Sequence, residues 1–192
     1  MKFVLLTHER EYDRPSNTGQ LALAAFPELC RRVLWSRVTP NEALKQACES
    51  GEALLLFPKE HDADETDSAS SVGPIVNASA VSSSEKEAIM PEQLLLKKEG
   101  EQGVRQVIIL DATWQEARKM VRQSPYLQAA KRLTLQESEP SRYRLRRNQL
   151  SQGLCTIECI ISLMHSLGMS QEALQLNEAF ALFMLDHRQV DA

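Results

Sequence analysis

A carboxylate and a hydroxyl stand two residues apart near the middle of the chain, at Asp111 and Thr113. They follow an apolar, β-branched run from Val107 to Leu110, which is typical of a strand buried on both faces of a parallel sheet. From Thr113 onward the apolar residues recur at helical spacing. A strand that gives way to a helix this quickly places its polar turn at the carboxyl edge of the sheet, where open α/β folds bind ligands. The turn is therefore a candidate binding or catalytic site.

The same turn also has a purely structural interpretation. Thr113 and Glu116 have the spacing of a capping box, in which a hydroxyl and a carboxylate satisfy free amides at the start of a helix. In that interpretation Asp111 is a solvent-exposed residue of an ordinary turn. Residue types and spacing leave both interpretations open.

A second group of chemically active residues is rich in arginine. Four arginines surround one tyrosine between Pro140 and Arg147. Arginine makes two-pronged contacts with phosphate or carboxylate, and tyrosine offers a face on which a nucleobase can stack. A solvated basic loop is the alternative interpretation of this segment.

Charge is distributed unevenly along the chain, although its net value is −4. The range 118–147 holds nine Lys and Arg against two Glu, whereas five acidic residues and no Lys or Arg fall within 60–67. A local excess of positive charge, and not the total, is what a nucleic-acid backbone meets. The acidic and then Ser/Ala-rich stretch at about 59–80 is predicted to be a flexible surface insertion.

Apolar runs and helix caps predict the elements that position these residues. At 192 residues the chain is expected to form one domain, 1–192. We expect strands at 2–7, 32–35, 53–57, 107–110 and 131–135, and helices through 21–25, after 39–42, at 84–98, from 113, from about 154 to 167 and from 170 to about 184. Ser124-Pro125 is expected to stop the helix that begins at Thr113, and Gly168 to end the penultimate one.

Composition narrows the class of protein. Hydrophobic residues reach 43% with 5% aromatics, and no run approaches the roughly 18 apolar residues of a membrane span. The first apolar run, which ends at Leu6, is too short for a signal peptide, so a cytoplasmic location is expected. Cys155 and Cys159 are four residues apart on a helical pattern without a second ligand pair, which favours core packing over a metal site.

Several motifs together resemble one known family. The string Leu110-Asp111-Ala112-Thr113-Trp114-Gln115-Glu116-Ala117-Arg118-Lys119-Met120 closely resembles the signature of the DTW-domain family. Further blocks that resemble this family follow the expected order along the chain: His8 with Asn17-Thr18-Gly19, Leu56-Phe57-Pro58, Ser141-Arg142-Tyr143-Arg144-Leu145-Arg146, and Leu154-Cys155-Thr156-Ile157-Glu158-Cys159. Ala112 departs from the glycine common after the signature aspartate, and a cysteine cluster found N-terminal to the domain in many members is absent from this chain.

The resemblance implies a fold and a reaction. Members look like SPOUT-superfamily proteins, so the implied fold is a single α/β domain, a mostly parallel sheet flanked by helices with a C-terminal trefoil knot. The family includes tRNA-uridine aminocarboxypropyltransferases, which move the 3-amino-3-carboxypropyl group of S-adenosylmethionine to N3 of a uridine and leave methylthioadenosine. The implied partner is tRNA or another structured RNA. No metal is expected, because the sulfonium is already a good leaving group, and a monomer is slightly favoured over a dimer.

The resemblance also assigns roles to residues. Asp111 is the candidate catalytic residue, either as the base that removes the N3 proton or as an orienting group. The expected contacts with S-adenosylmethionine are Leu56, Phe57, Pro58, Thr113, Trp114, Tyr143, Leu145, Thr156 and Glu158. The expected RNA contacts are His8, Asn17, Arg118, Lys119, Arg142, Arg144, Arg146 and Arg147. Two alternatives stay open: a SPOUT-like RNA methyltransferase and a non-catalytic RNA-binding module.

Overall fold

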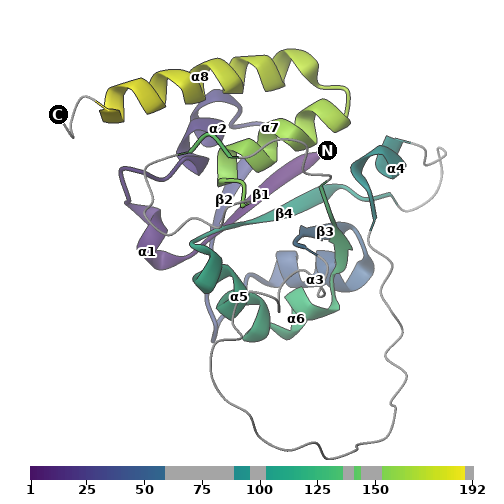
Figure 1. Cartoon of the computed structure of the whole chain (residues 1–192). Helices are drawn as coiled ribbons and strands as arrows, with labels where there is room; N and C mark the ends of the chain where they lie inside the picture. Colours follow the sequence, from purple (N-terminus) through teal and green to yellow (C-terminus); the bar gives the residue numbers. More distant parts are fainter. Residues whose placement is uncertain (59–88, 96–102, 136–140, 144–152, 189–192) are drawn as a thin grey trace, which may run out of the picture.

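A computed structural model describes residues 1–58, 89–95, 103–135, 141–143 and 153–188 of the chain. Its centre is a five-stranded sheet with the order β2-β1-β4-β3-β5 in which all pairs are parallel (Figure 1). The strands are β1 (Lys2–Thr7), β2 (Cys30–Leu34), β3 (Ala53–Leu56), β4 (Gln106–Asp111) and β5 (Lys131–Leu133). The predicted α/β class with a parallel sheet is confirmed.

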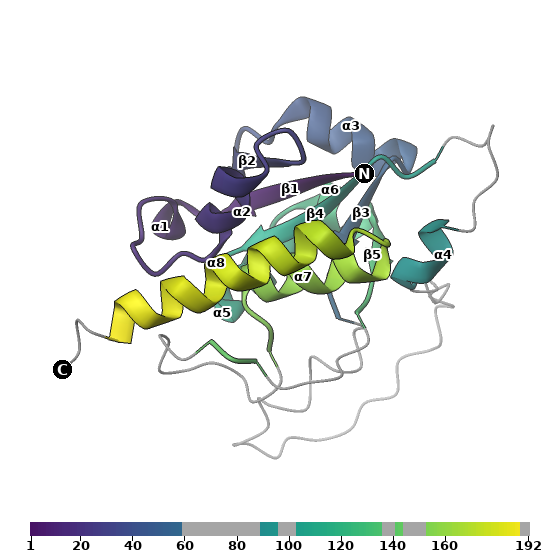
Figure 2. The ribbon, with the colours of Figure 1, turned by 90° about the horizontal axis from the view of Figure 1, so that it is seen from above.

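Helices cover both faces of this sheet (Figures 1 and 2). They are α1 (Glu9–Tyr12), α2 (Gly19–Ala25), α3 (Glu42–Ser50), α4 (Pro91–Leu95), α5 (Trp114–Arg122), α6 (Pro125–Ala129), α7 (Thr156–Ser166) and α8 (Ser170–Arg188). Side chains of α2, α4, α7 and α8 pack in the hydrophobic cluster on one face. Side chains of α3, α5 and α6 pack in the cluster on the other face.

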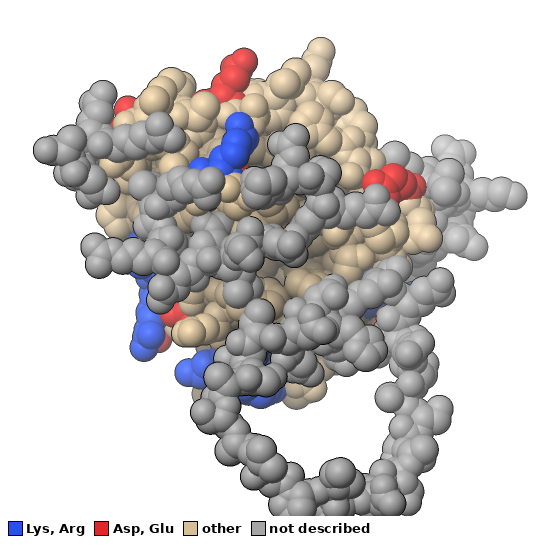
Figure 3. All heavy atoms as spheres, viewed as in Figure 1, with Lys and Arg blue, Asp and Glu red and all other residues tan. Residues whose placement is uncertain are grey.

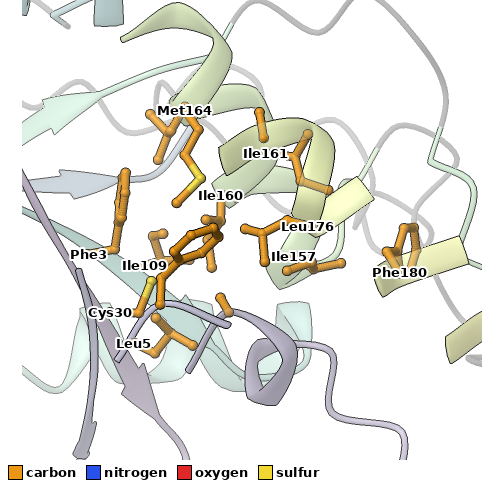
Figure 4. Close-up of a cluster of buried hydrophobic side chains, with 14 of the residues drawn as sticks. Phe3, Leu5, Cys30, Ile109, Ile157, Ile160, Ile161, Met164, Leu176 and Phe180 are labelled. Carbon is orange, nitrogen blue, oxygen red and sulfur yellow. The ribbon is translucent and has the colours of Figure 1, made fainter. Parts of the chain in front are cut away.

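Alternation along β1 explains why it is apolar from Phe3 to Leu6. Phe3 and Leu5 of β1 face the cluster formed with α7 and α8, shown in Figure 4. Val4 and Leu6 of the same strand face the opposite cluster. All four side chains are fully buried, and each contributes roughly 1.5–3 kcal/mol relative to an exposed position. A strand with two buried faces has no position left for a polar residue until it ends.

The strand order changes direction between β1 and β4. After β1 the chain moves outward to β2 by way of α1 and α2, and after β4 it moves the opposite way to β5 by way of α5 and α6. The loops that leave the carboxyl ends of β1 and β4 therefore diverge onto opposite faces. Such a topological switch point forms the crevice where open α/β sheets bind ligands. Thr7 and Asp111, the last residues of the two strands, are paired across it.

Several predicted boundaries are wrong, and each has a local reason. Asp111 is the last residue of β4, not the first residue of a turn. Ser124-Pro125 ends α5 as expected, but Pro125 also begins α6, because proline fits the first position of a helix. Ile89, expected in a helix, instead forms a parallel bridge to Leu133. The second strand starts at Cys30, two residues earlier than predicted.

Some predictions fall on parts of the chain that the structure does not describe. The insertion at 59–80 lies outside the described residues. So do segments 136–140 and 144–152, on whose course the trefoil knot and the SPOUT assignment depend, and both remain predictions. Within the described ranges, no helix combines the length and apolar character needed to cross a bilayer.

Candidate functional site

Asp111 is the centre of a buried hydrogen-bond cluster at the switch point. Its Oδ2 accepts from Thr7 Oγ1 at 3.0 Å and from Asn17 Nδ2 at 2.8 Å. Its Oδ1 accepts from Thr156 Oγ1 at 2.9 Å. The Asp111 side chain is 1% exposed, so the solvent-exposed turn interpretation is wrong. Burying a carboxylate is costly unless hydrogen bonds replace its water, and these three donors do so.

The Asn17-Thr18-Gly19 segment joins the first strand loop to this cluster. Asn17 Nδ2 also donates to the carbonyl of Glu11 at 3.0 Å, and Asn17 Oδ1 accepts from the backbone of Gln20 at 3.2 Å. Thr18 Oγ1 accepts from the backbone amide of Ile157 at 3.4 Å, at the start of α7. Asn17 was expected to contact RNA, but it is buried and holds the beginning of α2 against Asp111.

Glu158 anchors the segment 141–143 to the start of α7. Its Oε2 accepts from Ser141 Oγ at 2.6 Å and from the Cys155 amide at 2.9 Å, and its Oε1 accepts from the Arg142 amide at 2.6 Å. Tyr143 Oη donates to the carbonyl of Ser16 at 2.8 Å, which ties the same segment to the loop before α2. Glu158 therefore anchors the segment 141–143 to α7, and Tyr143 ties that segment to the loop before α2.

Tyr143 does not present the open stacking face that the sequence suggested. Its side chain is 2% exposed and packs near Phe180 of α8, with 6.5 Å between ring centroids. The ring of Tyr143 is therefore not exposed for stacking in this structure, and its contact with S-adenosylmethionine remains a prediction. Arg142 contacts α8 as well: its guanidinium donates to Asn177 Oδ1 and lies 5.5 Å above the Phe180 ring centroid.

Thr113 and Glu116 form the predicted capping box. Glu116 Oε2 accepts from the Thr113 amide at 3.0 Å and from Thr113 Oγ1 at 2.7 Å, and Thr113 Oγ1 accepts from the Glu116 amide at 3.3 Å. Burial raises the pKa of Glu116, but these hydrogen bonds and the electrostatic influence of His8 and Arg10 outweigh it and lower the pKa from its ordinary value of 4.5. The structural role of Thr113 is confirmed, and its contact with a cofactor remains a prediction.

A cavity of about 410 Å³ opens beside this capping box. The His8 ring stacks on Trp35 with 5.6 Å between centroids, and both residues line the cavity with Glu116. His8 Nδ1 accepts from the Arg10 amide at 3.3 Å and lies 3.8 Å from Glu116 Oε1. Three basic side chains also line the cavity: Arg10, Arg37 and Lys119.

Asp111 and this cavity both lie at the carboxyl ends of β1 and β4, but on opposite faces of the sheet. The backbone amide of His8 donates to the Asp111 carbonyl at 3.1 Å, whereas the two side chains point to different faces, as strand alternation requires. Sequence reasoning missed Trp35 and Arg10 as cavity residues. Arg10 lies in the polar segment that follows the first strand, which was the available signal.

The remaining predicted site residues lie in several different parts of the structure. Phe57 and Trp114 stack on each other with 5.2 Å between centroids. Leu56 and Pro58 are half-buried beside them at the end of β3. Arg118 lines a second hollow, on the opposite flank of α5 from the cavity that Lys119 lines. The other predicted contacts lie outside the described residues: Arg144, Leu145, Arg146 and Arg147.

Within the described residues no group of three or more His, Cys, Asp or Glu could hold a metal ion. Cys155 precedes α7 close to the Asp111 cluster. Burial raises the pKa of its thiol well above the ordinary value, so at neutral pH the sulfur is protonated and a poor nucleophile.

Comparison with known proteins identifies one related family. A family model described as the DTW domain matches residues 1–188. The match covers all five strands of the sheet and every member of the Asp111 cluster. No solved structure matches the chain.

Proposed function

The chain belongs to the DTW-domain family, and on that premise we propose that it transfers the 3-amino-3-carboxypropyl group of S-adenosylmethionine to N3 of a uridine in tRNA. Membership of this family is consistent with a tRNA-modifying activity. One observation supports the proposal further. Asn17 and Thr156, which come from two other motif blocks, both donate hydrogen bonds to the carboxylate of Asp111. That carboxylate lies at the topological switch point, the expected ligand edge of this sheet.

The residues at this edge fit the chemistry of S-adenosylmethionine. The Asp111 carboxylate and the hydroxyls of Thr7 and Thr156 are suited to the amino group and the ribose hydroxyls of such a molecule. The stacked rings of Phe57 and Trp114 give apolar surface at the neighbouring strand end. S-adenosylmethionine supplies an electrophilic carbon next to its sulfonium.

In the proposed reaction the uridine N3 displaces sulfur from that carbon. The N3–C bond forms as the C–S bond breaks, the bonding electron pair leaves with methylthioadenosine, and the N3 proton passes to a base. General-base assistance is typically worth about 10²–10⁴ in rate. Asp111 already accepts three hydrogen bonds and is buried, which favours a positioning role for it. The imidazole of His8 and the carboxylate of Glu116 line a cavity on the opposite face of the sheet from the Asp111 side chain, so neither is assigned as that base.

The proposal separates cleanly from its two rivals. A methyltransferase would release adenosylhomocysteine in place of methylthioadenosine, and an RNA-binding module would consume no S-adenosylmethionine. We therefore expect incubation with S-adenosylmethionine and deproteinised tRNA to yield methylthioadenosine and a uridine heavier by the aminocarboxypropyl group, both measured by mass spectrometry. Release of adenosylhomocysteine, or no consumption of the donor, would contradict the proposal.

Asp111→Asn tests the role of the cluster. Asparagine keeps the shape of the side chain but must present an NH₂ group to at least one of the three donors, so the site loses its alignment. We expect transfer to fall by about 100-fold or more, the scale on which misplaced catalytic groups act. Asp13→Asn, the same change at an exposed residue, is the matched control and should leave transfer unchanged. Normal turnover by Asp111→Asn, with both variants folded by circular dichroism, would remove Asp111 from the machinery.

A further inference from the structure

A second hollow, of about 340 Å³, lies on the flank of α5 opposite the His8 cavity. Three arginines converge on it from two elements: Arg118 and Arg122 from α5 and Arg132 from β5. The other described residues that line it are Phe57, Val121 and Gln128. None of these described lining residues is acidic.

The spacing of these arginines suits an anion that all three can share. Arg118 and Arg122 are four residues apart on one helix face, and like charges at that spacing destabilise a helix by a few tenths of a kcal/mol. Arg132 adds a third cation at the same hollow. An anion between the guanidinium groups would relieve this repulsion and would be held by several charge-assisted hydrogen bonds.

An aromatic wall fixes one of the three arginines. The Arg132 guanidinium carbon lies 5.1 Å above the Phe57 ring centroid, and the other neighbour of Phe57 is the ring of Trp114. This contact holds the planar guanidinium against an aromatic face, the geometry in which arginine is preferred to lysine for phosphate recognition. The stack also links the hollow to the carboxyl ends of β3 and β4, where the proposed S-adenosylmethionine contacts lie.

Basic residues flank α5 on both sides. Arg10, Arg37 and Lys119 line the first cavity together with Glu9 and Glu116, and the three arginines line the second without an acidic residue among its described lining. In Figure 3, Lys and Arg side chains gather at the lower left, around the places where Figure 1 draws α1 and α5. A strand of nucleic acid that passes α5 on the side of the second hollow would meet the three arginines there.

We propose that the arginine hollow binds a phosphate group of the RNA backbone, with Arg122 and Arg132 as its principal contacts. The identity of the partner as RNA rests on the proposed function, whereas the anion chemistry rests on the three guanidinium groups. Backbone phosphate contacts set the position and register of the nucleic acid without reading its sequence. The hollow would therefore position the RNA while the target uridine enters the switch-point site.

The test measures binding of fluorescently labelled, deproteinised tRNA over a series of salt concentrations. Each neutralised phosphate contributes roughly 0.7–0.9 to the slope of log K against log salt. We expect Arg122→Gln to weaken binding about five- to tenfold at low salt and to make the slope less steep by roughly one phosphate. Lys131→Gln removes one exposed positive charge next to Arg132 but outside the hollow, and it should change neither quantity.

Arg132→Lys and inorganic phosphate provide a second variant and a second ligand for this test. Arg132→Lys retains the charge but loses the planar fork, so affinity should fall while the salt slope stays close to that of the unmodified protein. Unchanged tRNA affinity and slope in Arg122→Gln would overturn the proposal. The proposal would also be overturned if inorganic phosphate raised the unfolding temperature of the unmodified protein but not of Arg122→Gln, while tRNA bound the two proteins equally. The hollow would then bind a free anion and not the RNA backbone. A reduced slope without release of methylthioadenosine would refute the proposed reaction and leave this inference standing.

Discussion

Replacing Gly19 by alanine would probe how tightly the chain packs around Asp111. Gly19 is the first residue of α2, and a Cβ built there would lie 2.7 Å from Leu5 Cδ2 and 3.1 Å from both Asn17 Oδ1 and Asp111 Oδ1. Leu5 is fully buried, so its side chain has little room to move aside. Both oxygens are held by hydrogen bonds. The methyl group therefore has no free space.

Two opposing effects determine how much Gly19→Ala changes the free energy of unfolding. In an unconstrained helix, Gly→Ala would stabilise the protein by about 0.5–1 kcal/mol. Inserting a methyl group into a packed core typically costs about 1–3 kcal/mol. The steric term exceeds the helical one, and the net destabilisation is expected to be about 1 kcal/mol. For a chain of this length that lowers the unfolding midpoint by about 2–4 °C.

The same substitution should affect transfer more than stability. Displacing Asp111 Oδ1 by a few tenths of an ångström lengthens its 2.9 Å hydrogen bond to Thr156. We expect turnover to fall by about tenfold, because small misplacements of a site are costly. Thermal unfolding followed by circular dichroism, together with single-turnover transfer, measures both effects. Gln20→Ala, at the exposed next position of the helix, is the control. A Gly19→Ala protein with a higher midpoint and normal turnover would refute the packing argument.

Two further predictions concern the loops around the site. Because the pKa of Glu116 is held below 4.5 in the folded protein, its charge contributes stability that is present above that pH and lost as the pH falls through the lowered pKa. Urea titrations measure the unfolding free energy of the unmodified protein and of Glu116→Gln. The difference between the two should thus be largest at neutral pH and shrink below pH 4.5, and a pH-independent difference would contradict this. Tyr143→Phe removes the donor to the Ser16 carbonyl and should lower the unfolding free energy by about 1 kcal/mol, so an unchanged urea midpoint would show that the hydrogen bond is negligible.

Local patterns in the sequence predicted the elements that depend on near neighbours. The run Val107–Leu110 indicated a strand because burial on both faces requires apolar residues, and the strand is present. The spacing of Thr113 and Glu116 indicated a capping box, which is confirmed. Gly168 was expected to end α7, and its φ of 74° suits a glycine in that position.

The burial of Asp111 could not be predicted in this way, because its partners are distant in the sequence. Thr7, Asn17 and Thr156 lie 104, 94 and 45 residues away from it. The spacing of residues along one segment carries no information about such contacts. The same reason hid the hollow shared by Arg122 and Arg132, whose residues become neighbours only when β5 adds to the edge of the sheet.

The separation of these partners has a consequence for protein synthesis. A ribosome delivers Thr7, Asn17 and Asp111 well before Thr156 and Glu158, which complete the cluster and anchor the segment 141–143. Until α7 has left the exit tunnel, the Asp111 carboxylate lacks one of its donors and this edge of the sheet stays open to water. A nascent chain that lacks α7 therefore cannot complete the hydrogen-bond cluster around Asp111.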